Sequence, residues 1–300
     1  MDKNIVIAGG TGFLGQALTE YFQSKNWKVS ILTRNPQAAN QIAWNGKELG
    51  KWSDCLENCD VLINLCGKSV DCRYTAKNKQ AILDSRLLPT QLLNKAISKS
   101  KNPPKIFLNA SSATAYVHSK KRRMTEKNGV IGHDFSMSVV REWEEAFFAT
   151  DHPKTRKVAL RTSIVLGDKG GAYPKLRQIT RLGLGGKQGS GNQMVSWISE
   201  LDFCKAIDHI IHTRYLEGAI NITSPEPLSN AAFMKALRTK IKPLFSIHQP
   251  KWLLELGAIF MRTETELLLK SRNVLPERLL GSGFEFSHKS ISSFLTNEID

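Results

Sequence analysis

The residues that could most clearly do chemistry are the glycines of the segment 9–15, which reads Gly-Gly-Thr-Gly-Phe-Leu-Gly. The segment follows an apolar run, 5–8, of the kind that forms a buried parallel strand. Glycines permit a tight turn and close approach of phosphate oxygens, and a helix beginning there directs unpaired N–H groups at an anion. The segment therefore predicts a dinucleotide site, with a purely structural turn as the alternative. The residues expected to hold the pyrophosphate are Gly9, Thr11, Gly12, Phe13 and Gly15.

The end of the next predicted strand, 28–33, indicates which dinucleotide is bound. An NAD-selective site usually places an acidic residue about 20 residues beyond the glycines, where it contacts the ribose 2′-hydroxyl. This sequence has Thr33 and Arg34 there instead. A hydroxyl and a guanidinium suit a 2′-phosphate, which arginine can bind through two parallel hydrogen bonds. We therefore predict NADP(H) rather than NAD(H); the alternative is that Arg34 is a solvated loop residue.

The elements that must position these residues alternate along the chain. A helix is predicted after the glycines, because apolar residues recur every three or four positions from Leu14 to Phe22. Further strands are predicted at 60–65, 105–110 and 158–162, with helices at 75–100 and 136–149. Strands that alternate with helices define an α/β fold, here a Rossmann-type doubly wound parallel sheet.

The second half of the chain is less regular. Glycines interrupt the periodicity between 167 and 194, which predicts a mobile, glycine-rich loop over the cleft. A strand at 219–223, a helix capped by Ser229 and a helical last fifty residues are expected beyond it. The predicted organisation is a dinucleotide-binding core over 1–166 completed by 195–223, a cleft loop at 167–194, and a mostly helical C-terminal substrate lobe at 224–300.

Charge and hydropathy exclude several classes of protein. The net charge is +15, and the basic excess lies in the first two thirds, where it would favour an anionic cofactor and substrate. The basic run 120–123 contains no aromatic residues, which favours a solvated loop over a nucleic-acid-binding stripe. No apolar run is long enough to span a bilayer, and the first strand begins too early to leave room for a signal peptide. We expect a cytoplasmic protein that binds neither membrane nor nucleic acid.

The cysteines give no indication of a metal site. The five are scattered, and none has a histidine nearby at ligand spacing. An odd, scattered set fits reduced structural thiols better than disulfides or zinc. We predict no metal.

Two segments resemble the extended short-chain dehydrogenase/reductase family, which contains nucleotide-sugar epimerases and dehydratases. The segment 111–116, Ser-Ser-Ala-Thr-Ala-Tyr, is similar to a strand end of UDP-galactose epimerases, and 160–167 is similar to the segment where the family leaves the cofactor domain. Stretches that resemble an epimerase-like subfamily with an extra C-terminal helical module are 63–67, 183–186, 189–191, 196–198, 274–280 and 283–284. The resemblance spans nearly the whole chain and implies the family's fold and a homodimer. Further cofactor contacts are expected from Leu65, Gly67, Ser111 and Arg161.

The resemblance stops at the acid/base residues. Active members carry Tyr-x-x-x-Lys on the helix after the serine-bearing strand, where the lysine and the cofactor ribose lower the tyrosine pKa for proton exchange during hydride transfer. This chain has Phe135 and Val139 at those positions. Phenylalanine cannot transfer a proton and valine carries no charge, so family likeness alone does not establish an active dehydrogenase.

Two sets of residues could replace the missing pair. Tyr116, four residues after Ser112, could donate a proton with Ser112 as relay; the alternative is an amphipathic residue at the rim. The second set is the cluster Arg73, Tyr74, Lys79 and Arg86, whose cations could bind an anionic substrate. Lys79 and Arg86 lie seven residues apart and would share one face of a helix. Arg86 stands where relatives have Asn in an Asn-x-x-Gly-Thr pattern. The alternative for these cations is a solvated helix face.

The sequence thus predicts an NADP(H)-binding, epimerase-like oxidoreductase that acts on an unidentified anionic or sugar-derived small molecule. Its catalytic candidates are Ser112 and Tyr116. The competing prediction, favoured by the missing Tyr and Lys, is a catalytically silent NADP(H)-binding sensor or regulatory protein.

Overall fold

A seven-stranded parallel sheet forms the centre of the computed structural model, which describes residues 3–255, 264 and 269–297. The strand order is β11-β6-β5-β4-β1-β2-β3. The strands are β1 (Asn4–Ala8), β2 (Lys28–Thr33), β3 (Gln41–Ala43), β4 (Val61–Asn64), β5 (Ile106–Ser112), β6 (Arg156–Thr162) and β11 (Gly218–Ile222). From β1 the chain proceeds to β2 on one side, and from β4 it proceeds to β5 on the other. This reversal between β1 and β4 opens the crevice in which such sheets bind ligands.

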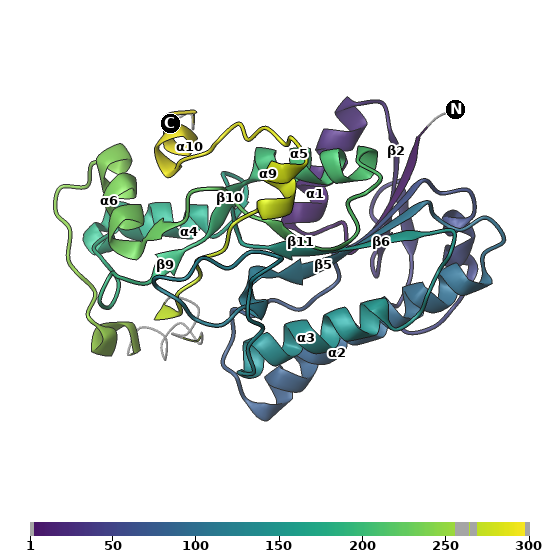
Figure 1. Ribbon diagram of the computed structural model, residues 1–300, viewed down its shortest axis with the longest axis horizontal. Helices are drawn as coiled ribbons and strands as arrows, with labels where there is room; N and C mark the ends of the chain where they lie inside the picture. Colours follow the sequence, from purple (N-terminus) through teal and green to yellow (C-terminus); the bar gives the residue numbers. More distant parts are fainter. Residues whose placement is uncertain (1–2, 256–263, 265–268, 298–300) are drawn as a thin grey trace.

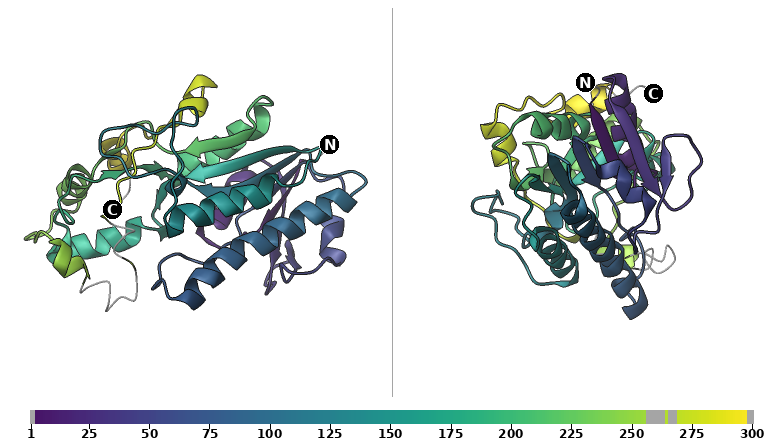
Figure 2. Two further views of the ribbon diagram at one scale, coloured as in Figure 1. Left: turned by 60° about the horizontal axis from the view of Figure 1, so that its bottom comes forward. Right: turned by 90° about the vertical axis from the view of Figure 1, so that its right-hand side faces the viewer.

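Helices cover both faces of the sheet (Figure 1). On one face α2 and α3 lie side by side, and on the other α1 packs against α5 (Figure 2). Successive side chains of β1 explain the two layers, because Ile5 and Ile7 join the core beneath α1 and α5, whereas Val6 and Ala8 join the core beneath α2 and α3. These helices are α1 (Phe13–Ser24), α2 (Ala76–Lys99), α3 (Phe135–Phe148) and α5 (Glu200–His212).

A smaller region continues from the carboxyl end of β6 and occupies the left of Figure 1. Its core brings together rings from distant segments: Phe294 lies 5.2 Å from Tyr173 and 5.9 Å from Trp197 between ring centroids. Its strands are β7 (Ile164–Gly167), β8 (Gly170–Gly171), β9 (Met194–Val195), β10 (Trp197–Ser199) and β12 (Leu228–Ser229). Its helices are α4 (Tyr173–Ile179), α6 (Asn230–Ile241) and α10 (Ile291–Asn297), whereas α9 (Glu277–Gly281) packs against β11 of the central sheet. This region closes the crevice at the carboxyl ends of the central strands.

Most predicted elements are present, and their ends are capped as the sequence indicates. The Thr75 side chain accepts a hydrogen bond from the Asn78 N–H (3.2 Å) at the start of α2. The Ser229 side chain accepts one from the Ala232 N–H (3.2 Å) at the start of α6. Side-chain oxygens satisfy N–H groups that a helix leaves unpaired, so the caps fix where these helices begin.

Two predictions for the second half need correction. The segment 167–194 is not a continuous loop, because it contains α4 and a π-helical turn, Thr180–Leu184. Its glycines flank the helix, and Gly183, with φ of +79°, sits where the helical path ends. Within the last fifty residues the described part is helical at 251–255, in α9 and in α10, with irregular segments between α9 and α10, and the rest of that prediction falls partly on residues outside the described ones.

All five cysteines are free. Burial raises the pKa of Cys55, Cys59 and Cys66 to about 12, so these thiols stay protonated at neutral pH. Among the described residues, no group of three or more His, Cys, Asp and Glu side chains could hold a metal ion. None of the helices in that part of the chain is long and apolar enough to cross a membrane.

Candidate functional site

The glycine turn joins β1 to α1 and is built from backbone. Gly9 has φ of +75°, a conformation that favours glycine, and its N–H donates to the Leu32 carbonyl of β2 at 3.0 Å. A Cβ on Gly9 would lie 3.1 Å from the Cys66 backbone nitrogen and 3.2 Å from its Sγ. The turn therefore passes directly over the end of β4, at the point where the sheet order reverses.

The two later glycines open the end of α1. Gly12 occupies the N-cap, and in the described structure no side chain bonds to the first N–H groups of the helix. Those N–H groups, at the positive end of the helix dipole, are suited to an anion. A Cβ on Gly15 would lie 2.4 Å from the Gly10 Cα, so only glycine lets α1 pack this closely on the turn. The turn thus fits a pyrophosphate with the residue types that the sequence analysis assigned to it.

The end of β2 presents a hydroxyl and a guanidinium. Thr33 is buried and its carbonyl accepts a hydrogen bond from the Trp44 N–H at 3.0 Å, while Arg34 is exposed just beyond it. Burial raises the pKa of Cys66, and the positive charge of Arg34 opposes that shift. The residue that follows β2 is thus a cation where an NAD-selective site would have a carboxylate.

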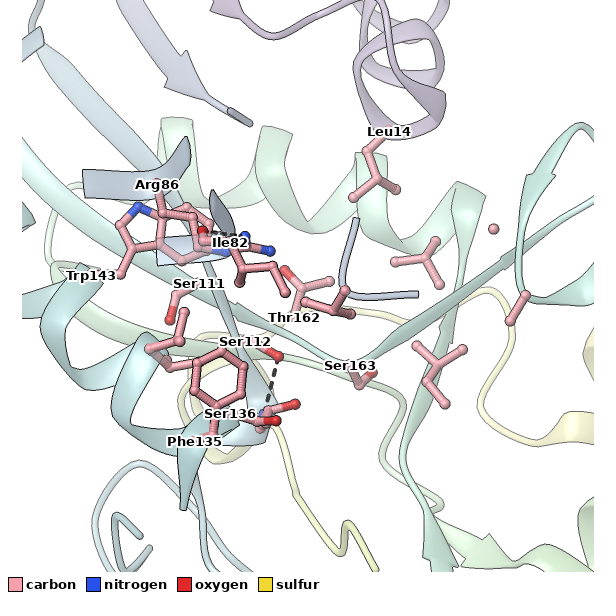
Figure 3. Close-up of a pocket in the computed structure, with 18 of the residues that line it drawn as sticks. Leu14, Ile82, Arg86, Ser111, Ser112, Phe135, Ser136, Trp143, Thr162 and Ser163 are labelled. Carbon is pink, nitrogen blue, oxygen red and sulfur yellow. Dashed lines mark hydrogen bonds between the residues drawn. The ribbon is translucent and has the colours of Figure 1, made fainter. Parts of the chain in front are cut away.

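A cavity of about 380 Å³ lies beside the turn, between the start of α1 and the inner face of α3 (Figure 3). Its lining is mainly apolar, its polar side chains are the Tyr74 phenol, the Arg86 guanidinium, the Trp143 indole and six aliphatic hydroxyls, and none of its described lining residues is acidic. The hydroxyl residues are Ser111, Ser112, Thr114, Ser136, Thr162 and Ser163. Hydroxyls with one cation and no carboxylate suit a neutral or anionic molecule rich in oxygen.

The two serines at the end of β5 both line this cavity but have different partners. The Ser111 Oγ donates to the Glu144 Oε1 of α3 at 2.6 Å. The Ser112 Oγ accepts a hydrogen bond from the Thr114 N–H at 3.1 Å and lies beside Ser136 and Phe135 in Figure 3. Ser112 can therefore still donate its hydroxyl proton to a bound molecule, whereas Ser111 is committed to α3.

The catalytic role expected for Tyr116 is contradicted by its position. Its side chain is 1% exposed and lies outside the lining of the cavity. The phenol donates to the Asn221 Oδ1 at 2.9 Å and accepts from the Arg161 Nη1 at 2.8 Å. Burial raises its pKa despite these partners, which disfavours the phenolate. A phenol sealed away from the cavity cannot donate a proton to a substrate bound there.

Arg161 likewise does not contact the cavity. Its Nε and Nη2 donate to the two carboxylate oxygens of Glu144 at 2.8 and 2.7 Å, and its Nη1 donates to Tyr116. The paired side chains are only 12% and 13% exposed. A bidentate pair of this kind is among the strongest side-chain contacts, and it ties α3 to β6. The cofactor contact expected for Arg161 stays a prediction, and in this structure its guanidinium holds Glu144 and Tyr116.

Of the three cations expected to bind substrate, only Arg86 lines the cavity. The Arg73 Nε lies 3.7 Å from the Glu264 carboxylate, and the Lys79 Nζ lies 5.0 Å from the Phe135 ring centroid, both on exposed side chains. The shared helix face expected for Lys79 and Arg86 is not enough to bring both to one ligand, because seven residues separate them along α2.

Arg86 is held by backbone and by an indole. Its Nη1 donates to the carbonyls of Lys68 (3.1 Å) and Ile82 (2.9 Å), and its Cζ lies 5.2 Å from the Trp143 ring centroid, as Figure 3 shows. A Cβ on Gly67 would lie 3.3 Å from that Cζ. Gly67 therefore leaves room for the guanidinium at the end of β4. Leu65, at the same strand end, donates its N–H to the Ala8 carbonyl at 2.9 Å.

Sequence reasoning missed two residues of α3. Trp143 lines the cavity, and its spacing of four from Val139 and eight from Phe135 on one helix could have revealed it. Glu144 had no comparable indication, because its partner Arg161 lies on a strand 17 residues away.

The fold and the glycine turn define a dinucleotide-binding α/β protein, and comparison with known proteins gives its family. Residues 5–222 match the NAD dependent epimerase/dehydratase family, and residues 249–298 match a domain of unknown function (DUF1731). The chain belongs to the NAD dependent epimerase/dehydratase family, as the resemblance predicted.

Relatives extend over the whole chain. The epimerase family protein SDR39U1 of Homo sapiens is 31% identical over 294 residues, which cover 97% of this chain and 98% of the relative. The epimerase family protein YfhF of Bacillus subtilis is 31% identical, covering 99% and 98%. The crystal structure of human SDR39U1 (isoform 2) with NADPH has a TM-score of 0.88 at 30% identity over 97% of both chains. MoeE5 in complex with UDP-glucuronic acid and NAD, at 17% identity, coverage of 98% and 97%, and a TM-score of 0.76, shares the fold.

Proposed function

We propose that this protein binds NADP(H) at the glycine turn and transfers hydride to or from a small, oxygen-rich substrate in the adjoining cavity. The observation that carries the proposal is the pairing of an open glycine turn with a cation, Arg34, at the end of β2. The turn accounts for the pyrophosphate, and Thr33 with Arg34 accounts for the 2′-phosphate. The NADPH-bound structure of human SDR39U1 supports this cofactor.

The cavity supports a substrate that is anionic or sugar-derived. It adjoins the turn through Phe13 and Leu14, and it offers hydroxyls and Arg86 as hydrogen-bonding groups. Arg86 binds an anionic or carbonyl oxygen of the substrate, and Ser112 donates to another oxygen. A nicotinamide cofactor, when bound, supplies or accepts hydride at the substrate carbon.

A second candidate is a catalytically silent protein that binds NADP(H) and reports its redox state to a partner. Phe135 and Val139 favour it, because neither can exchange a proton on the helix where active relatives do so. Turnover of any carbonyl substrate separates the two candidates, since a silent protein binds the cofactor without consuming it.

Isothermal titration with NADPH, NADP⁺, NADH and NAD⁺ tests the cofactor site. We expect the NADP forms to bind more tightly, and Arg34→Ala to weaken NADPH binding by about 10- to 100-fold because a charge-assisted hydrogen bond contributes about 1.5–3 kcal/mol. NADH binding should not change in this variant. Arg214→Ala, which removes an exposed arginine outside the site, is the matched control. Absence of binding to all four nucleotides would overturn the proposal.

A further inference from the structure

One face of α3 lines the cavity with three residues that carry neither an acid/base group nor a charge. Phe135, Val139 and Trp143 follow one another at intervals of four residues, and all three line the cavity. The first two are the positions at which the family resemblance places Tyr and Lys. At these positions α3 therefore offers no acid/base group to the cavity.

The wall opposite α3 brings a phenol to Phe135. Tyr74 lies in the connection between β4 and α2 and lines the cavity. Its ring meets the Phe135 ring edge to face, with centroids 4.9 Å apart and planes at 67°. Its backbone N–H donates to the Glu264 carboxylate at 2.7 Å, which anchors this part of the connection. The phenol thus lies against the residue that replaces the family's tyrosine.

The same wall brings a cation to Trp143. Arg86 stacks on the indole, and among the described residues no carboxylate forms an ion pair with it. Burial lowers its pKa to about 10, and the Coulombic interaction with Tyr74 acts in the opposite direction. Arg86 therefore remains a cation at neutral pH, and it lines the same cavity as Tyr74.

We propose that Tyr74 and Arg86 form a relocated acid/base pair, reaching from the β4–α2 connection and from α2 to the face of α3 that has lost the family's own pair. The proposal rests on the hydride-transfer function proposed above. A bound reduced nicotinamide supplies the hydride that reduces a substrate carbonyl carbon. The Tyr74 O–H bond breaks as its proton passes to the carbonyl oxygen, which completes the alcohol. Arg86 stabilises the resulting phenolate, which then takes a proton from water.

The charges around Tyr74 favour this role. Arg86 lines the same cavity as Tyr74, the Lys79 Nζ lies 5.0 Å from the Phe135 ring centroid, and Arg73 pairs with Glu264, whose carboxylate accepts from the Tyr74 N–H. The packed element α3 contributes the uncharged Phe135. A cation beside a phenol stabilises the phenolate relative to the phenol, which is the role proposed for Arg86.

An ultraviolet difference titration of the cofactor-free protein tests the pairing without depending on turnover. Subtracting the titration of Tyr74→Phe from that of wild type isolates the ionisation of Tyr74, and the same subtraction is repeated in an Arg86→Gln background. We expect Arg86→Gln to raise the midpoint for Tyr74 by about 1–3 pH units, because a nearby opposite charge is removed. Arg214→Gln should leave it unchanged. An unchanged midpoint in Arg86→Gln would overturn the pairing.

Kinetics separate failure of this pair from failure of the proposed function. With NADPH and para-nitrobenzaldehyde as the carbonyl probe, Tyr74→Phe should lower kcat by about 100-fold or more while the Kd for NADPH is unchanged. Tyr215→Phe, which alters an exposed tyrosine, should change neither. Wild-type kcat in Tyr74→Phe would overturn the relocated pair and leave the oxidoreductase function standing. If wild type consumes no NADPH with this or other small carbonyls, the proposed function fails, and the titration alone still decides the pairing.

Discussion

The glycine turn beside the cavity and the α3 wall of the cavity differ in what they have kept of the family's pattern. The turn between β1 and α1 keeps every glycine of the dinucleotide pattern, in the conformation and packing that the pattern requires. The inner face of α3 keeps its helix and its spacing but presents Phe135 and Val139. The glycine turn is therefore suited to cofactor binding, whereas Phe135 and Val139 on α3 cannot exchange a proton.

A pyrophosphate site and a proton-transfer site need different things from the protein, which explains why the glycine turn and α3 differ. A pyrophosphate site is made of backbone N–H groups and empty space, and neither can be supplied from elsewhere in the fold. A proton donor or a cation needs only its terminal atoms in the right place, so a neighbouring element can provide it. Tyr74 and Arg86 stand on such an element. A site built from backbone is thus tied to its own turn, whereas the side chains of a site can be supplied by another element of the fold.

The largest effect is expected from Gly15→Ala. Its Cβ would lie 2.4 Å from the Gly10 backbone, which cannot yield as a flexible side chain can. We expect a loss of about 1–3 kcal/mol or more in the free energy of unfolding, together with loss of NADPH binding. Chemical denaturation and isothermal titration measure the two. Gly281→Ala is the matched control, because no atom lies within 4 Å of the Cβ it would add. Equal stability of the two variants would show that the turn tolerates a side chain.

The second prediction concerns Val139 on the cavity face of α3. Val139→Lys would restore the family's residue, but the position is 5% exposed and Arg86 lines the same cavity. We expect a loss of about 2–4 kcal/mol at neutral pH, because burial and a like charge both oppose an ammonium group. Val130→Lys makes the same change at a position that is 42% exposed and should cost far less. Denaturant unfolding of both variants measures whether α3 still accepts a lysine at position 139. Equal free energies of unfolding for the two variants would show that it does.

The smallest effect is a pH dependence at the start of α3. Asp134 caps the helix by accepting from the Met137 N–H at 2.9 Å, and the Lys270 Nζ lies 2.5 Å from its other oxygen. Burial is the largest influence and raises the pKa of Asp134, but these two partners together hold it below its ordinary value. A depressed pKa stabilises the fold above the unfolded value of about 3.9, and the contribution is lost as pH falls through the folded pKa.

Asp134→Asn keeps a capping oxygen and removes the charge, so it isolates this contribution. We expect it to cost at most about 1 kcal/mol near neutral pH, discounted because the carboxylate is partly exposed. The difference from wild type should vanish at pH values below about 3. Thermal unfolding across pH measures it, with Asp151→Asn as the exposed control. A difference that persists at low pH would mean that the charge of Asp134 is not its source.

The regular elements were largely predictable because their causes are local. The apolar run before Gly9 and the periodic stripe after it fix β1 and α1, and capping residues such as Thr75 and Ser229 mark where other helices begin. The prediction of a loop at 167–194 was wrong in part, because it followed the many glycines and overlooked the seven residues between them that form α4. Local rules describe preferences of a segment and cannot tell which of two competing preferences packing will favour.

The sequence by itself determined the parallel sheet, the glycine turn and the cation at the end of β2, because each depends on residue types close together in the chain. Only the tertiary structure decided which side chains reach the cavity. It sealed Tyr116 against Asn221 and Arg161, and it placed Tyr74 and Arg86 against α3. Tyr116 lies 105 positions from Asn221 and 45 positions from Arg161 in the chain. Tyr74 and Arg86 lie outside α3, in the β4–α2 connection and on α2. Their geometry follows from how strands and helices pack, which no local pattern encodes.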